Sequence, residues 1–220
     1  MTSKLTQSRA LLAFSVVMLQ VGLALLVFGV ACMGGSSDKS HDVVISSVTS
    51  LNPSATPITG PVNSSPPARM IIQSIKVDAP IMTLGRDANL ALEVPDYQNS
   101  RNPGAVVGWY NVFPVPGSGS NAIFAGHVTF DGRAVFYHLD QVSPGDTVKI
   151  VTEDGKTLVY QVFENLTVDP SRVDVLNATK EDTITLITCG GGDFIYVPGE
   201  EFGGHYPGRI VVRARLMQVA

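Results

Sequence analysis

One cysteine stands at the point where an apolar run meets three glycines, in the stretch DTITLITCGGGDF at residues 182–194. The β-branched residues before Cys189 indicate a buried strand, and the end of such a strand would hold the thiol rigidly. Roughly a few per cent of an ordinary thiol is ionised at neutral pH, and the thiolate is a strong nucleophile. Cys32, the other cysteine, lies in an apolar segment near the N-terminus, so the two are not expected to pair. Cys189 is therefore predicted to be a free nucleophile.

A nucleophilic thiol needs a partner that transfers protons, and histidine titrates in the right range. His127 follows a glycine at the end of the strand-like run NAIFAGH, a presentation suited to a catalytic site. His138, in VFYHL, falls in a predicted short helix, where a packing or surface role is the better interpretation. His205 lies in the glycine-rich stretch FGGHYPG and is expected to be exposed to solvent. His127 is therefore the preferred general acid and base.

A third group is needed to stabilise the oxyanion of a tetrahedral intermediate. Arg209 begins the last apolar run, IVVRARLMQV follows it, and Arg213 comes four residues later. Strand alternation places the two arginines on the same face. Spacing alone leaves open whether either is a site residue or a solvated charge on the outside of a barrel.

The bulk composition limits the classes of function. The chain has 220 residues, of which 45% are hydrophobic and 15% charged, with a formal net charge of −4. This is enough apolar material for one domain with accessory segments. No basic run is present, which argues against a nucleic acid partner. We see no cluster of carboxylates of the kind that holds a metal, and the proposed thiol chemistry requires neither a metal nor another cofactor.

The first 33 residues predict a membrane anchor. Residues 10–33 are apolar and uncharged, which matches the roughly 20 residues needed to cross a bilayer as a helix. Lys4 and Arg9 precede this segment, so the short N-terminus is expected in the cytoplasm and the rest of the chain outside. Three alternatives remain open: a buried soluble helix, a cleavable signal peptide, and a lipoprotein site at Cys32. The expected location is a single-pass protein of the cell membrane that contacts lipid through this anchor.

Two further regions follow the anchor. Residues 34–67 are rich in Ser, Thr and Pro and are predicted to form a disordered linker. Residues 68–220 contain short β-rich runs with close turns, including the Asp-Gly turn in TEDGKT and an alternating run in NLALEVP. Only two short helices are indicated, near AVFYHL and RVDVL. This pattern predicts a mostly β fold, a closed or nearly closed barrel.

Three motifs in this order resemble the sortases, which are membrane-anchored cysteine transpeptidases of Gram-positive and related bacteria. They are AGH at 125–127, TLITC at 185–189 and an arginine that enters the last strand. The resemblance covers nearly all of residues 68–220 and is strongest to the class E and F-like members. It implies a closed eight-stranded β-barrel with short helices, preceded by one N-terminal transmembrane helix.

The resemblance also implies roles for individual residues. Cys189 would attack the Thr–Gly bond of a C-terminal LPxTG- or LAxTG-like sorting signal and form a thioacyl-enzyme. His127 would protonate the departing glycine amine and later deprotonate the incoming amine. Arg209 would hold the substrate and support the oxyanion. Thr188 would add a backbone or hydroxyl contact, although its role as a β-branched strand former explains it equally well. Arg213 is the reserve candidate. In those classes the arginine often follows a tyrosine directly, whereas here Pro207 stands at that place and Arg209 comes two residues later.

The partners implied are surface proteins that carry a sorting signal, and an amine acceptor of the cell wall or a pilin. Two other functions remain as alternatives. An extracellular cysteine peptidase would release its product to water, and a non-catalytic membrane-tethered β-domain would have an unreactive thiol. A cysteine L,D-transpeptidase is disfavoured, because its S-H-G-x-C-like run is absent from the sequence.

Overall fold

Short strands rich in β-branched and other apolar residues make up most of the regular structure in the part of the chain that the structure, a computed structural model, describes. This part comprises residues 56–199 and 203–220. The predicted membrane anchor at 10–33 and most of the predicted linker lie outside these ranges and stay predictions. Within the described ranges, no helix is long and apolar enough to cross a membrane.

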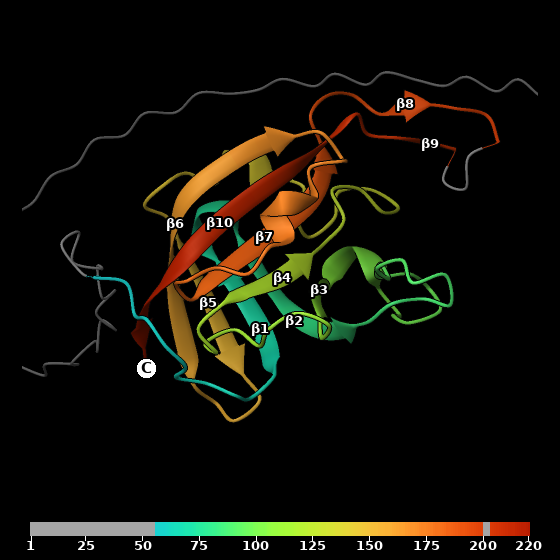
Figure 1. The fold of residues 1–220 in the computed structure, drawn as a ribbon. Coiled ribbons are helices and arrows are strands. Elements are labelled where there is room, and N and C mark those ends of the chain that lie inside the picture. The colour runs from blue at the N-terminus through green and yellow to red at the C-terminus, as the bar shows by residue number, and fades with distance from the viewer. Residues whose placement is uncertain (1–55, 200–202) are drawn as a thin grey trace, which may run out of the picture. The chain divides into compact units, whose positions relative to one another are not determined.

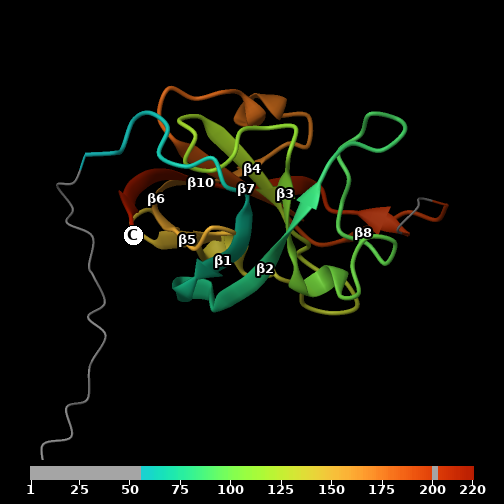
Figure 2. The same ribbon diagram turned by 90° about the horizontal axis from the view of Figure 1, so that it is seen from below.

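Eight strands close into a barrel in the order β1-β2-β3-β4-β7-β10-β6-β5, which confirms the mostly β barrel (Figures 1 and 2). These strands are β1 (Pro67–Ile72), β2 (Val77–Leu84), β3 (Val107–Tyr110), β4 (Asn121–Ala125), β5 (Thr147–Thr152), β6 (Thr157–Val168), β7 (Thr183–Gly190) and β10 (Gly208–Val219). A separate two-stranded ribbon, which projects from the barrel in Figure 1, pairs β8 (Ile195–Tyr196) with β9 (Gly204–His205).

The helices of the described ranges are single 3₁₀ turns. They are η1 (Gln73–Ile75), η2 (Pro103–Ala105), η3 (Leu139–Gln141) and η4 (Val173–Leu176). η3 begins where the predicted helix at 134–139 was expected to end, and η4 lies within the run RVDVL. The Asp-Gly turn joins β5 to β6 as predicted, with Gly155 at a φ of +88°.

The alternating run NLALEVP does not form a strand. It belongs to the long connection between β2 and β3, where Leu92 makes only an isolated bridge to Arg86. A local turn explains the difference, because the Asp87 side chain accepts hydrogen bonds from the amides of Asn89 (2.8 Å) and Ala91 (2.9 Å). Such side-chain bonds to the backbone compete with strand pairing.

Two apolar layers lie on either side of the sheet formed by β4, β7 and β10. Phe124, Leu186 and Val212 belong to the main core inside the barrel. On the outer face, Ile123 belongs to a cluster with Ile187 and with Leu92 of the β2–β3 connection, and η4 covers the neighbouring part. Burying each such side chain contributes about 1.5–3 kcal/mol. The outer layer therefore holds η4 and the β2–β3 connection against the same three strands.

A buried carboxylate fixes the start of β7. Asp182 is fully buried and accepts hydrogen bonds from the Tyr160 hydroxyl (2.7 Å) and from the amides of Gly117 (3.2 Å) and Gly119 (2.5 Å). The loop after β3 is thereby tied to β6 and β7.

The N-terminal part of the described chain, residues 56–66, contacts the barrel, although we predicted it to belong to the linker. The Ile58 amide donates to the Leu216 carbonyl at 2.9 Å, and the amide group of the buried Asn63 side chain donates to the Pro116 carbonyl at 2.9 Å.

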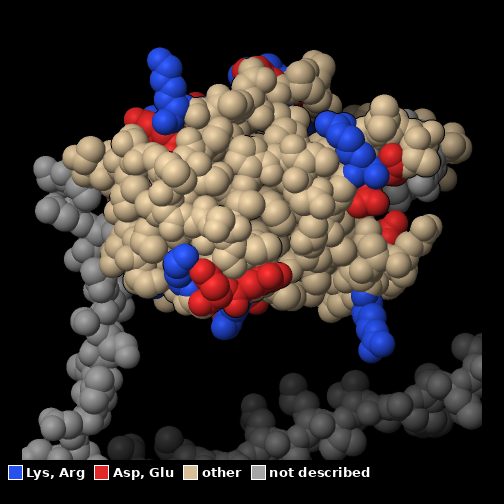
Figure 3. All heavy atoms as spheres, turned by 60° about the horizontal axis from the view of Figure 1, so that its bottom comes forward, with Lys and Arg blue, Asp and Glu red and all other residues tan. Residues whose placement is uncertain are grey.

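Charged side chains on the face shown in Figure 3 lie mainly at its margins, around an uncharged centre. Lys and Arg form no continuous patch on this face. That distribution agrees with the absence of a basic run in the sequence.

Candidate active site

Strand β7 lies between β4 and β10, and this order determines which residues can meet Cys189. On one side, Cys189 is paired directly with Arg209 in the antiparallel ladder. On the other side, β4 runs parallel to β7, with Ala125 paired to Ile187. Continuing that register by two residues brings His127 level with Cys189. His127, just beyond the end of β4, and Arg209 of β10 therefore come to opposite sides of the cysteine.

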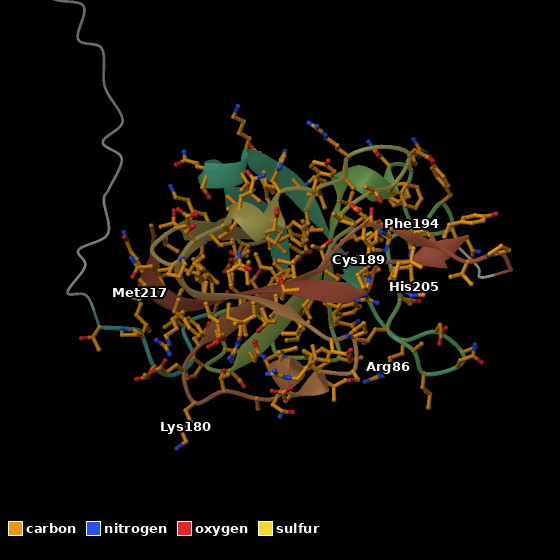
Figure 4. The ribbon with its side chains drawn as sticks, turned by 90° about the horizontal axis from the view of Figure 1, so that it is seen from above. Arg86, Lys180, Cys189, Phe194, His205 and Met217 are labelled. Carbon is orange, nitrogen blue, oxygen red and sulfur yellow. The ribbon has the colours of Figure 1, made fainter. Side chains whose placement is uncertain are left out.

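Strand alternation places these three residues on the outer face of the barrel. Ile187 and Val211 belong to the outer apolar layer, and Cys189 and Arg209 lie two residues from them along β7 and β10. Side chains two residues apart in a strand share a face. Ala125 also belongs to the outer layer, so the same rule places His127 there. Figure 4 shows Cys189 at the same end of the barrel as Phe194 and His205, with Met217 at the opposite end.

Cys189 is a free, half-buried thiol. Its neighbour Thr188 is buried and donates its hydroxyl to the Gly126 carbonyl at 2.8 Å. The Gly126 amide donates in turn to the Ile187 carbonyl at 3.2 Å. These two bonds extend the pairing of β4 and β7 beyond the end of β4, as far as the residue before His127. The Thr188 hydroxyl is thus engaged inside the protein, and its predicted support of the oxyanion or substrate stays a prediction.

Gly126 permits the close approach that places His127. A Cβ at this position would come within 2.7 Å of Phe136 Cδ2 and 2.8 Å of Val135 Cγ1. Real Cβ atoms do not reach such distances, so a larger residue would displace either these side chains or the backbone that carries His127.

The His127 imidazole is half-buried and held by the β2–β3 connection. Its Nε2 atom lies 2.6 Å from the carbonyl oxygen of Pro95. Its ring also contacts that of Phe130, at a centroid separation of 4.9 Å. Pro95 had not been singled out from the sequence. It contributes through its backbone carbonyl, which is present at every residue, so no motif could have identified it.

The two candidate arginines have different surroundings. Arg209 is half-buried, its Nη1 donates to the Gly208 carbonyl at 2.9 Å, and it forms no ion pair with a carboxylate of the described ranges. Arg213 lies beside Thr185 in the ladder, forms an ion pair with Glu164 at 3.3 Å and stacks over the Phe163 ring at 5.4 Å. The structure therefore places Arg209 next to Cys189, whereas Arg213 lies further along β10 and is bound to Glu164.

The remaining histidines lie elsewhere. His138 interacts with the side chain of Gln141 at 2.9 Å and packs edge-on against Tyr137, in a different pocket from the one that Cys189 lines. His205 is paired with Ile195 in the β8–β9 ribbon. Neither lies in register with Cys189.

A cavity of about 430 Å³ opens beside Cys189 at this end of the barrel. Aromatic side chains and two carboxylates contribute to its lining. These are Tyr137, Phe194, Tyr206, Asp140 and Asp193. The sequence did not indicate any of these five as a site residue, and it indicates Asp140 only as a turn residue. They come from the connections β4–β5, β7–β8 and β9–β10, whose proximity depends on the fold.

The three glycines after Cys189 form part of the wall of this cavity. A Cβ at Gly190 would meet Ile210 Cγ1 at 2.7 Å, and Gly191 has a φ of +81°. Both positions therefore favour glycine, the first for close packing and the second for its left-handed backbone. Beyond them, Phe194 packs edge-on against Tyr206, whose hydroxyl is hydrogen-bonded to the Thr129 hydroxyl at 3.0 Å.

A comparison with family models matches residues 70–217 to the sortase domain. The chain belongs to the sortase family, whose members are transpeptidases. This confirms the family predicted from AGH, TLITC and the arginine of the last strand. A comparison with curated proteins found no match.

Solved structures show the same fold. Sortase A of Listeria monocytogenes is 22% identical with a TM-score of 0.51, and the match covers 71% of this chain and 90% of that one. Sortase C-1 of Actinomyces oris is 24% identical with a TM-score of 0.50, covering 69% and 71%. A lid mutant of sortase A from Corynebacterium diphtheriae is 24% identical with a TM-score of 0.51, covering 71% and 73%. At these identities the likeness supports the fold rather than the substrate.

Proposed function

We propose that this sortase is a class E or F-like enzyme that cleaves the Thr–Gly bond of an LPxTG- or LAxTG-like sorting signal and transfers the acyl group to an amine. The observation that carries the proposal is the strand register, in which Cys189 is paired with Arg209 and His127 follows two residues after the β4–β7 pair of Ala125 with Ile187. This register supports a site in which the nucleophile comes from β7, the proton carrier from the segment just after β4, and the cation from β10.

In the first half-reaction, the Cys189 thiolate attacks the threonine carbonyl carbon and forms a C–S bond. The carbonyl oxygen becomes an oxyanion, which the Arg209 guanidinium stabilises. When the intermediate collapses, the C–N bond breaks, and His127 gives a proton to the departing glycine amine. The product is a thioacyl-enzyme. Loss of one oxyanion donor typically costs about 2.7–4 kcal/mol of transition-state stabilisation.

The second half-reaction reverses these roles. An incoming amine attacks the thioester carbon, and His127 accepts the proton that the amine loses. The C–S bond then breaks and returns Cys189 to its thiolate form. The acyl group ends in a new amide bond, so the transfer needs no cofactor.

The outer apolar layer supports the apolar part of the sorting signal. Ala125, Ile187 and Leu176 are half-buried members of this layer. Ala125 and Ile187 lie two residues before His127 and Cys189 on the same face. An extended Leu-Pro or Leu-Ala segment laid here would reach the thiol with its Thr–Gly bond.

The cavity of about 430 Å³ offers the second substrate a separate approach to the same thiol. Its Asp140 and Asp193 carboxylates favour a cationic amine, and its Phe194 and Tyr206 rings provide contact area. We assign this cavity to the amine acceptor, a cell-wall peptide or a pilin. The protein is proposed to act outside the cell, anchored through residues 10–33.

Product analysis tests this function. The full-length protein is incubated with a library of sorting peptides, with and without triglycine as the amine, and the products are identified by mass spectrometry. We expect an acyl–triglycine product with the wild type and less than about one per cent of that turnover with Cys189→Ala. Hydrolysis alone, in the presence of the amine, would identify a cysteine peptidase instead. Turnover that persists in Cys189→Ala would exclude Cys189 as the nucleophile.

A further inference from the structure

We propose that the β2–β3 connection, residues 85–106, is a positioning element that fixes the tautomer of His127 and assigns its proton transfers to Nδ1. The assignment of the tautomer depends only on the structure. Its catalytic consequence rests on the proposed function.

The contact between His127 and Pro95 determines which ring nitrogen carries a proton. The Nε2 atom lies 2.6 Å from the Pro95 carbonyl oxygen, and a carbonyl oxygen can only accept a hydrogen bond. Nε2 must therefore carry a hydrogen, whether the ring is neutral or charged. In the neutral ring the lone pair is left on Nδ1, so Nδ1 is the nitrogen that gains and loses the proton.

The Pro95 carbonyl is itself held in place by Asn99. The carbonyl oxygen of Pro95 and the amide of Asp96 belong to one planar peptide group. The Asp96 amide donates to Asn99 Oδ1 at 2.8 Å, and the Asn99 side chain donates back to the Val94 carbonyl at 2.9 Å. Asn99 thus holds one side of the peptide plane while the other side faces His127. Proline adds rigidity, because its ring fixes φ.

An aromatic row attaches the same connection to the loop that carries His127. The ring of Tyr97 packs edge-on against Phe130 at 5.2 Å, and Phe130 contacts His127 at 4.9 Å. The Tyr97 hydroxyl also donates to the Asp131 carboxylate. The Tyr97 side chain remains 67% exposed, so it is not part of the core. Its contacts instead hold the β2–β3 connection against residues 127–131.

These contacts give the histidine a single orientation for both half-reactions. A ring that could turn would present Nδ1 and Nε2 alternately, whereas the held ring leaves only Nδ1 for proton transfer. Misplacing a catalytic group by about 1 Å can cost as much as about 10²-fold in rate. Asn99 and Tyr97 are accordingly positioning residues, which act through His127.

The test compares Asn99→Ala with Asp87→Ala in the full-length protein. Asp87 is a matched control, because it stabilises a similar turn in the same connection without contacting Pro95 or His127. The tautomer of His127 is read from ¹⁵N chemical shifts of the imidazole, and kcat and KM are measured with a sorting peptide. Circular dichroism confirms folding.

We expect the wild type and Asp87→Ala to show the tautomer protonated on Nε2. Asn99→Ala should show a mixture of tautomers and a kcat reduced by about tenfold or more, with KM changed by less than about threefold. Tyr97→Ala should lower kcat in the same way, and Tyr97→Phe, which keeps the ring contact with Phe130, should restore most of it.

Two results would overturn the inference. One is a wild-type His127 protonated on Nδ1, and the other is equal effects of Asn99→Ala and Asp87→Ala. Both results are read from the ¹⁵N chemical shifts of His127, which do not require an active nucleophile. Activity that survives Cys189→Ala would contradict the proposed function and leave the tautomer result intact, so the two failures are distinguishable.

Discussion

Arg209 and Arg213 share one face of β10 but meet different neighbours. Arg209 is paired with Cys189, whereas Arg213 is paired with Thr185, about 13 Å away at 3.3 Å per residue. We predict that Arg209→Ala lowers kcat/KM by about 10²-fold or more, roughly 2.7–4 kcal/mol, because it removes the cation proposed to stabilise the oxyanion. Arg213→Ala should cost less than about tenfold in the same steady-state assay.

Arg209→Lys provides a control for charge. We expect it to recover little activity, because an ammonium keeps the charge but lacks the planar fork of the guanidinium. Circular dichroism of the three variants separates catalytic loss from unfolding. A larger loss at Arg213 than at Arg209 would show that the pairing of β7 and β10 does not identify the catalytic arginine.

Gly126 precedes the proposed proton carrier and leaves no room for a side chain. We predict that Gly126→Ala lowers the free energy of unfolding by about 1–3 kcal/mol through overpacking. It should also lower kcat, because Phe136, Val135 or the backbone of His127 must move. Gly85→Ala is the matched control, since its nearest contact for a Cβ is an ordinary 3.6 Å. Urea denaturation and kinetics measure the two effects, and equal results for both glycines would contradict this account.

At the scale of single residues, the sequence predicted those side chains whose position follows from a local pattern. Cys189 ends a β-branched run, and His127 follows a glycine at the end of another. Pro95 and Asn99 have no such pattern. Pro95 ends the alternating run and Asn99 follows it, and the turn that the Asn99 side chain stabilises places the Pro95 carbonyl beside His127.

The pairing of β4 with β7 is the element that assembles the proposed site. The bond from Thr188 to the Gly126 carbonyl is its last contact before His127. Thr188→Val keeps the shape of the side chain but leaves that buried carbonyl without its donor. We predict a loss of about 1–3 kcal/mol in the free energy of unfolding and a reduced kcat, with both largely recovered in Thr188→Ser. A Thr188→Ser variant as impaired as Thr188→Val would show that the hydroxyl is not the cause.

The sequence predicted the strand pairing that a turn motif specifies, but not the pairings between strands that lie far apart in the chain. The hairpin between β5 and β6 follows from its Asp-Gly turn. The parallel pairings of β2 with β3 and of β4 with β7 have no local signal, because each joins strands separated by long connections. The closed eight-stranded barrel was therefore implied by family resemblance rather than by the strands themselves.

For the whole molecule, Asp182 links acid–base chemistry to stability. Burial raises the pKa of this carboxyl, even though hydrogen bonds from Tyr160, Gly119 and Gly117 act in the opposite direction. Because the pKa of Asp182 is higher in the folded than in the unfolded protein, its protonation stabilises the fold. This contribution is complete below the unfolded-state pKa of about 3.9 and is lost as the pH rises through the folded-state pKa.

We therefore predict that the wild type gains stability relative to Asp182→Asn as pH falls from about 7 toward about 4. The variant cannot ionise at this position, whereas all other carboxyl groups are shared and cancel in the difference. Urea denaturation at several pH values measures the difference in the free energy of unfolding between the two proteins, wild type minus variant. If this difference does not change with pH, or grows as the pH rises, the raised pKa of Asp182 is contradicted.

The chain enters the barrel far from the proposed site. Ile58 is hydrogen-bonded to Leu216, which lies seven residues from Arg209 along β10, about 23 Å at 3.3 Å per residue. If the chain is tethered before residue 56, as proposed, the tether joins the barrel at the end opposite Cys189. That arrangement would suit the proposed transfer to an amine acceptor in the cell wall.

The last prediction concerns this tether. If residues 10–33 anchor the protein with the barrel outside, protease added to intact cells should release a folded domain. The contacts of Ile58, Val62 and Asn63 protect residues 56–66, so cleavage should fall within 34–55, and mass spectrometry of the released fragment locates it. Cleavage within 56–66 would show that these contacts do not persist in the cell. Resistance in intact cells, followed by digestion after lysis, would place the barrel in the cytoplasm and contradict the proposed transfer to the cell wall.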